Sequence, residues 1–169
     1  SYTVMYLAKE KGYDVYAACA DTGGFSAEQL RTNEENAYKL GAKQYVTLDV
    51  TKEYYEKSLK YMIFGNVLRG GTYPISVSSE RIFQGMAIAR YAKEIGADAI
   101  AHGSTGAGND QVRFDMTFLV MAPGTEIITL TRDRVLTRQE EVDYLNAHGF
   151  KADFAKLKYS YNVGIWGTS

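Results

Sequence analysis

The most constraining feature of this sequence is the alternation of short apolar runs with longer stretches of helical periodicity. Strand-like runs occupy residues 13–20, 44–50, 97–102 and 125–130. Between and around them, apolar residues recur at helical spacing, and most of these stretches stop at a glycine. Strands separated by helices favour parallel pairing, with helices covering both faces of the sheet. The sequence therefore predicts an α/β fold with a parallel, Rossmann-like sheet.

Capping patterns refine the expected helices. Ser26 with Gln29, and Thr137 with Glu140, have the spacing of capping boxes, and Thr51 is expected to cap the helix that follows it. Apolar residues at helical spacing predict three helices, each with one apolar face. The residues of these faces are 55, 59, 62 and 63 in the first helix, 82, 86 and 89 in the second, which covers 80–95, and 112, 116, 119 and 120 in the third. The chain opens on a helix over 2–12 with no strand before it, so the first strand of the fold is expected to be absent.

Composition excludes several functional classes. The 169 residues carry a net charge of −1, without the clustered Lys and Arg that a nucleic-acid surface needs. No apolar run approaches the roughly 20 residues that cross a bilayer. Cys19 is the only cysteine, so no intramolecular disulfide can form, and a buried, inert thiol is expected. His102 and His148 have no second ligand at metal-binding spacing, so no protein metal site is expected. A reducing, aqueous compartment, the cytoplasm, is the default.

The segment "HGSTGAGNDQVRF" at 102–114 carries the clearest chemical signal. Gly103, Gly106 and Gly108 allow close approach of a ligand to the backbone, as at nucleotide sites. Asp110 and Arg113, spaced i and i+3, share one face of a helix that starts there. Their charges match the ammonium and carboxylate of a free amino acid. The alternative is a strand-to-helix turn with a helix cap and a surface ion pair of little energetic value.

The longer stretch "ADAIAHGSTGAGNDQVRF" closely resembles the signature of the argininosuccinate synthase family, ATP-pyrophosphatase-type ligases. The resemblance extends from "DVYAACADTGG" through "LGAKQYVTLDV" to "YSYNVGIWGTS". It implies that the ureido oxygen of citrulline attacks the α-phosphorus of ATP and releases pyrophosphate. The amine of aspartate then displaces AMP from the citrullyl-adenylate. The resemblance also implies Mg²⁺ bound mainly to the ATP phosphates, and a cytoplasmic homo-oligomer, a tetramer in the family.

Carried over by position, the resemblance implies a specific set of contacts. ATP is expected at Ala20 and Gly103, aspartate at Thr105, Asn109 and Asp110, and citrulline at Tyr73, Ser78, Asn109, Arg113, Ser160 and Ser169. Without the resemblance, 18–24 would be a β-to-α turn, Tyr73 a packed tyrosine, and 158–169 an ordered loop around Trp166. The family commonly has "TSIARP" where this chain has "VSSERI", and Arg81 matches. No nucleophile or general base is assigned, which fits adenylation catalysed by positioning and charge stabilisation.

The family's phosphate-binding loop, Ser-Gly-Gly-Leu-Asp-Thr-Ser, follows its first strand, and these 169 residues do not contain it. The sequence therefore predicts that residues 1–169 form part of a nucleotide-binding domain, with 150–169 leading toward a missing C-terminal synthetase domain. Such a chain is not expected to make argininosuccinate by itself. Two other interpretations remain: another adenylating enzyme of the superfamily, acting on tRNA or another amide acceptor, and a non-catalytic nucleotide-binding or regulatory module.

Overall fold

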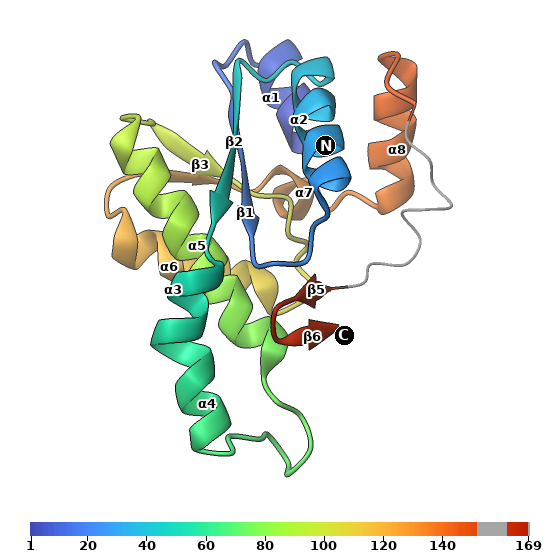
Figure 1. Ribbon diagram of the computed structural model, residues 1–169. Coiled ribbons are helices and arrows are strands. Elements are labelled where there is room, and N and C mark those ends of the chain that lie inside the picture. The colour runs from blue at the N-terminus through green and yellow to red at the C-terminus, as the bar shows by residue number, and fades with distance from the viewer. Residues whose placement is uncertain (152–161, 169) are drawn as a thin grey trace.

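The computed structural model describes residues 1–151 and 162–168. It contains parallel strands covered by helices, as Figure 1 shows, which confirms the α/β class. Strand β1 (Tyr16–Asp21) pairs in parallel with β2 (Gln44–Asp49), and β3 (Ala99–Ala101) pairs in parallel with β4 (Glu126–Ile128). These are two separate two-stranded sheets within the described residues, rather than one continuous sheet.

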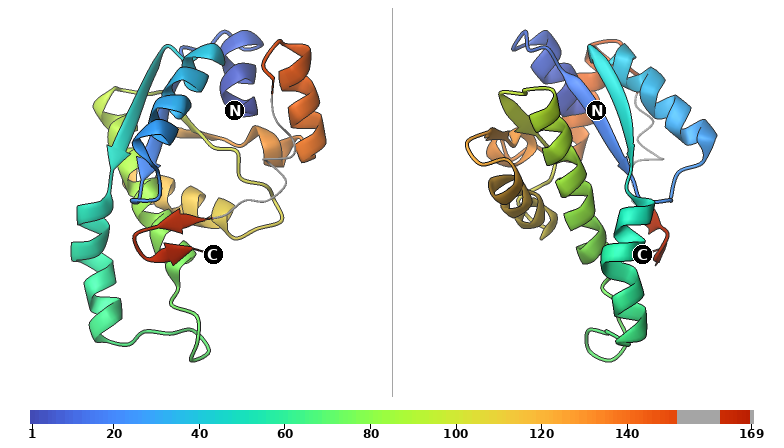
Figure 2. Two further views of the ribbon diagram at one scale, coloured as in Figure 1. Left: turned by 45° about the vertical axis from the view of Figure 1, so that its right-hand side comes forward. Right: turned by 60° about the vertical axis from the view of Figure 1, so that its left-hand side comes forward.

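The helices complete the architecture. The longer ones are α1 (Tyr2–Lys9), α2 (Ala27–Lys39), α5 (Ser76–Glu94), α6 (Asp110–Met121) and α8 (Arg138–Ala147). Short α3 (Thr51–Tyr54), the π-helical turn η1 (Tyr55–Leu59) and α4 (Lys60–Phe64) form an arm that extends away from the strands, while α7 (Leu130–Asp133) follows β4 (Figures 1 and 2). A hairpin of β5 (Val163–Gly164) and β6 (Gly167–Thr168) lies nearest the C-terminus. No described helix is both long and apolar enough to cross a membrane.

Local capping follows the sequence in two of three cases. Both capping boxes form, at the starts of α2 and α8. The prediction for Thr51 is wrong, because Thr51 is the first residue of α3 and its side chain does not cap that helix. The Asp49 carboxylate accepts hydrogen bonds from the Thr51 N–H, at 2.9 Å, and from its hydroxyl, at 2.6 Å. A charged acceptor at the end of β2 thus takes the place of the hydroxyl cap.

The expected apolar face of the 51–64 segment is also corrected. Tyr54 and Leu59 are the buried side chains there, whereas Tyr55 and Ile63 are exposed. The reason is η1, since a π-turn inserts an extra residue and brings positions five apart onto one face. Tyr54 and Leu59 form a small core cluster with Phe83 of α5.

Helices α5 and α6 pack side by side, but not through the predicted faces. Helix α5 starts at Ser76, four residues before the expected start; Ala89 is buried as expected, but Ile82 is exposed. The side chains at 112, 116, 119 and 120 lie on the exposed side of α6, and the buried side carries Phe118 and Thr117. Gly85 permits this packing, because a Cβ there would lie 3.0 Å from the Thr117 Cγ2.

A groove of about 1280 Å³ separates the two strand pairs. Its walls come from β1, β3, α1 and α5, and β1 and β3 pair only with β2 and β4 among the described strands. Cys19 of β1 is half-buried in this wall, and burial raises the pKa of its thiol, in keeping with an inert cysteine. The hydroxyl of Tyr91, also in the groove wall, is buried and has no hydrogen-bond partner among residues 1–151 and 162–168.

Candidate functional site

The candidate site lies where β1 and β3 end. After β1, the Asp21 carboxylate accepts a hydrogen bond of 2.8 Å from the Gly23 N–H and closes a tight turn, which gives Asp21 a structural role. Gly23 has φ +85°, a conformation that favours glycine. Ala20, the last groove residue of β1, and Gly103, just beyond β3, both line the groove. Parallel α/β folds bind ligands at this edge of their strands.

The glycine-rich loop after β3 is held by the first turn of α6. The Gln111 side-chain amide donates to the carbonyl oxygens of Gly106, at 2.7 Å, and Gly108, at 3.3 Å. Thr105 and Asn109, two of the residues assigned to aspartate, lie exposed in this loop. Helix α6 begins at Asp110, as the sequence predicted. The loop therefore presents two uncharged polar side chains beside a charged helix start.

Three of the assigned residues form one polar cluster between α5 and α6. Arg113 donates to Asp110 Oδ1 at 2.6 Å and to the Ser78 hydroxyl at 3.0 Å. Arg81 donates from Nε to Asp110 Oδ2 at 3.1 Å. All of these side chains are at least half buried, with 36% of the Asp110 side chain exposed. This contact between two helices differs from the isolated surface pair considered as the alternative.

Arg81 joins the cluster to the groove, since its side chain lines the groove and contacts Asp110. The structure thus brings two parts of the predicted site next to each other, one lined by Ala20 and Gly103, the other made by Asp110 and Arg113. Tyr73 has a different contact: its hydroxyl accepts a hydrogen bond of 3.2 Å from the Val77 N–H at the start of α5. Ser160 and Ser169 lie outside the described residues.

His102, at the end of β3, takes part in a network of hydrogen bonds. Its Nδ1 accepts a 3.3 Å hydrogen bond from the Ser104 N–H, so Nε2 carries the proton and donates to Asp115, 2.8 Å away. Arg132 of α7 also donates to Asp115, at 2.6 Å, and to the Gln111 side-chain oxygen, at 3.1 Å. Burial favours the protonated form of Asp115, but the hydrogen bonds from Arg132 and His102 outweigh it and lower its pKa. This network fixes the base of the glycine-rich loop.

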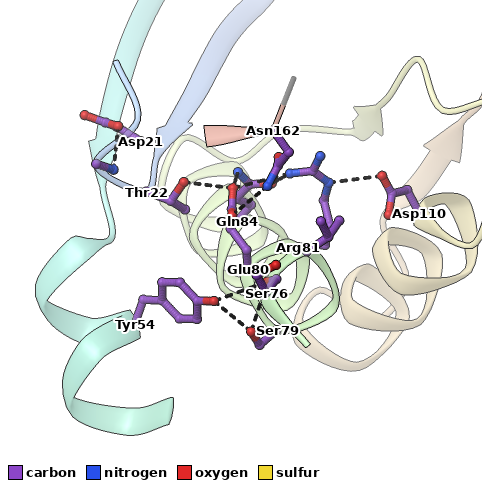
Figure 3. A network of polar contacts seen from close by, with 12 residues as sticks. Asp21, Thr22, Tyr54, Ser76, Ser79, Glu80, Arg81, Gln84, Asp110 and Asn162 are labelled. Atoms are coloured by element: carbon purple, nitrogen blue, oxygen red, sulfur yellow. Dashed lines mark hydrogen bonds and ion pairs between the residues drawn. The ribbon is translucent and has the colours of Figure 1, made fainter. Parts of the chain in front are cut away.

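No sequence pattern pointed to Glu80, the most buried charged side chain near the site. Figure 3 shows its carboxylate among side chains from the turn after β1, from α5 and from the segment before β5. Oε1 accepts hydrogen bonds from Thr22 at 2.8 Å, Gln84 at 3.0 Å and Arg81 at 3.5 Å, and Oε2 accepts one from Asn162 at 2.9 Å. Thr22 and Asn162 lie 58 and 82 residues away in the chain, too far for any local pattern to reveal.

Parallel strands, a groove between them and polar side chains at their carboxyl ends define an α/β domain of Rossmann-like architecture. A family model described as the arginosuccinate synthase N-terminal HUP domain matches residues 1–151. The chain therefore belongs to the argininosuccinate synthase family, a family of ATP-dependent carbon–nitrogen ligases.

Curated relatives agree with this assignment. The chain is similar to proteins named argininosuccinate synthase from Pyrobaculum aerophilum, with 36% identity over 166 residues, and from Methanocaldococcus jannaschii, with 37% over 163. A third, from Lactococcus lactis subsp. cremoris, is 37% identical over 169 residues. These alignments cover 96–99% of the chain but only 41–42% of each relative. The chain thus spans about two fifths of the length of these relatives.

Proposed function

We propose that this chain supplies binding surfaces for ATP, citrulline and aspartate in an argininosuccinate synthase. The whole enzyme would join citrulline to aspartate through citrullyl-AMP, releasing pyrophosphate and then AMP. The observation that carries the proposal is the cluster of Ser78, Arg81, Asp110 and Arg113 beside the groove lined by Ala20 and Gly103. A non-catalytic nucleotide-binding module needs the groove but has no need of that charge arrangement.

The end of the groove at Ala20 and Gly103, beside the carboxyl ends of β1 and β3, suits the adenosine part of ATP. Ala20 has a small side chain and Gly103 has none, so a flat base and ribose can approach both strand ends closely. In this proposal Mg²⁺ is held mainly by the ATP phosphates, because this hard cation keeps several water ligands and takes few from protein. When bound, Mg²⁺ would neutralise negative charge on the phosphates as pyrophosphate leaves.

The polar cluster suits two zwitterions. Asp110 would take the α-ammonium of aspartate, and Arg113 the carboxylate of citrulline in a bidentate contact. The present Arg113–Asp110 ion pair has to open for this, and Arg81 stays on Asp110 and limits the cost of separating the charges. Thr105, Asn109 and Tyr73 would add neutral hydrogen bonds, Tyr73 by exchanging its Val77 partner for citrulline. Ser160 and Ser169 remain proposed citrulline contacts.

In this proposal catalysis rests on position. The chain's residues hold the ureido oxygen toward the α-phosphorus and the aspartate amine toward the adenylate, with no group assigned to proton transfer.

The proposal includes a cytoplasmic homo-oligomer, a tetramer, that acts on small molecules rather than on nucleic acid. The near-neutral net charge of −1 supports the last point. We also propose that these residues are part of a larger nucleotide-binding domain, whose further strand would occupy the groove.

Binding measurements on the isolated chain test the proposal. Calorimetric titration with citrulline should show roughly tenfold or greater weakening in Arg113→Lys, because an ammonium cannot make the bidentate contact. Val112→Ala, on the exposed side of the same helix, is the matched control and should bind as the wild type does. Equal citrulline affinity in Arg113→Lys and wild type would contradict the site. Citrulline- and aspartate-dependent pyrophosphate release by residues 1–169 alone would contradict the prediction that they do not make argininosuccinate by themselves.

A further inference from the structure

The Glu80 carboxylate is surrounded by hydrogen-bond donors of this chain. Oε1 accepts hydrogen bonds from Thr22, Arg81 and Gln84, and Oε2 accepts one from Asn162. Both oxygens of the carboxylate therefore already bond to side chains of the protein. Glu80 is also 1% exposed, and a buried charge of this kind is strongly destabilising if its partners are removed. Its chemistry is therefore that of a positioning residue and not of a ligand-binding one.

The partner that Glu80 positions is the C-terminal hairpin, β5–β6. Asn162, immediately before β5, donates to Glu80, and the Ile165 N–H donates to the Thr22 carbonyl at 2.8 Å. The hairpin backbone passes so close that a Cβ on Gly164 would lie 2.9 Å from Glu80 Oε2 and 3.1 Å from Thr22 Oγ1. The hairpin is thus docked through a charged hydrogen bond to a buried acceptor, with the backbone bond at Thr22 beside it.

Glu80 also connects this hairpin to both parts of the candidate site. Thr22 lies in the turn that follows Ala20, on the proposed adenosine side. Arg81, which reaches Glu80 with one guanidinium nitrogen, holds Asp110 with another. Displacement of the carboxylate would therefore disturb the adenosine side, the amino-acid side and the hairpin together.

We propose that Glu80 is a latch that docks the C-terminal hairpin onto the end of β1 and sets the geometry of the substrate cluster through Arg81. The second half of this statement rests on the proposed function. The first half is independent of it, because it concerns contacts within the chain. Residues 160 and 169, which adjoin the hairpin in the sequence, are proposed citrulline contacts, so we expect citrulline affinity to be higher when the hairpin is docked.

Trp166, the only tryptophan, reports hairpin docking without any ligand. Its indole N–H donates to the Pro74 carbonyl at 2.8 Å, and its ring packs against Tyr54, Leu59 and Phe83. An undocked hairpin exposes this ring to water, which moves its emission to longer wavelength and increases quenching by acrylamide.

Exchanging the carboxylate and the amide tests the latch. Asn162→Asp places a second carboxylate against Glu80 and should lower the ratio of docked to undocked hairpin by roughly tenfold or more. Glu80→Gln is the matched control: the new amide can donate to Asn162, whose own amide turns to present its oxygen, so the hairpin stays docked. The double variant Glu80→Gln, Asn162→Asp restores one donor facing one carboxylate and should recover the wild-type emission and quenching.

This rescue separates a latch from a side chain that merely fills space. The latch is overturned if Asn162→Asp leaves the Trp166 signal unchanged, or if the double variant is no better docked than Asn162→Asp. Circular dichroism on each variant checks that the remaining helices are retained. Citrulline titration of the same four proteins then tests the functional half, and citrulline affinity should fall in Asn162→Asp and recover in the double variant. If Trp166 reports docking and release while the wild type binds no citrulline, the proposed function fails and the latch stands.

Discussion

At the scale of single residues, two glycines determine how closely the hairpin approaches the end of β1. A Cβ built on Gly24 would lie 1.9 Å from the Val163 carbonyl oxygen, and one on Gly164 would meet the Glu80 carboxylate. Backbone cannot yield in the way that a flexible side chain can. The glycines therefore matter here for the space that they leave, since neither has positive φ.

Gly24→Ala is expected to lower the free energy of unfolding by about 1–3 kcal/mol, because the added methyl group displaces β5. Urea denaturation followed by Trp166 emission measures the change. Gly108→Ala is the control: a Cβ there meets nothing within 4 Å, so the effect should stay within about 0.5 kcal/mol. Equal stability of the two variants would show that β5 does not pass over Gly24 as described.

At the scale of elements, an ion-pair group ties the arm to the body of the molecule. Glu53 of α3 accepts hydrogen bonds from Arg90 of α5, at 3.0 Å, and from Lys57, at 2.8 Å. These two hydrogen bonds, that from Arg90 first, lower the pKa of Glu53 to about 2. Arg90 thus connects α5 to a segment 37 residues earlier in the chain.

The depressed pKa predicts how stability depends on pH. The unfolded chain ionises Glu53 near pH 4.5, so the stabilising contribution is complete above about pH 5 and is lost as the pH falls toward about 2. Glu53→Gln lacks this contribution at every pH. The difference in free energy of unfolding between the wild type and Glu53→Gln, measured by urea denaturation, should therefore be smaller at about pH 3 than at about pH 6, because the two pKa values of Glu53 lie below about pH 5. A difference that is constant or grows on acidification would contradict the pairing.

The sequence was sufficient for elements whose signals are local. Capping boxes at Ser26 and Thr137 depend on residues three apart, and both form. It was insufficient where packing decided the outcome. The π-turn at Tyr55–Leu59 changes which residues face Phe83. In α6, which packs closely against α5 at Gly85, Phe118 is buried and the larger apolar set of the helix is exposed. Periodicity identifies an apolar face but not the neighbour that will cover it.

At the scale of the whole molecule, the groove separates two strand pairs whose facing edges have no strand between them among the described residues. We expect that an apolar strand placed before Ser1 in a longer chain will fill this groove in parallel orientation, since strands covered on both faces are continuously apolar. An added strand that contributes a few kcal/mol should raise Tm by roughly 5–10 °C. Amide exchange in β1 and β3 should slow at the same time.

The control is the same extension with two prolines in its strand, which cannot donate to the ladder. If both extensions give the same exchange rates in β1 and β3, the groove does not accept a strand.

The candidate site also depends on the arrangement of the whole molecule. Sequence resemblance gave Asp110, Arg113 and Ser78, which the fold brings together, but the partners of Glu80 and the His102–Asp115–Arg132 network arise only when distant segments meet.

Helix α5 has a consequence for how this molecule comes apart. It contacts β1, β3, α3 and α6, and its Glu80 holds the hairpin, while no described strand pairing crosses the groove. Unfolding of α5 is therefore expected to remove its contacts with β1, β3, α3 and α6 together. Local unfolding that leaves α5 intact therefore keeps the two strand pairs connected. Unfolding of α5 removes the helix that contacts both of them.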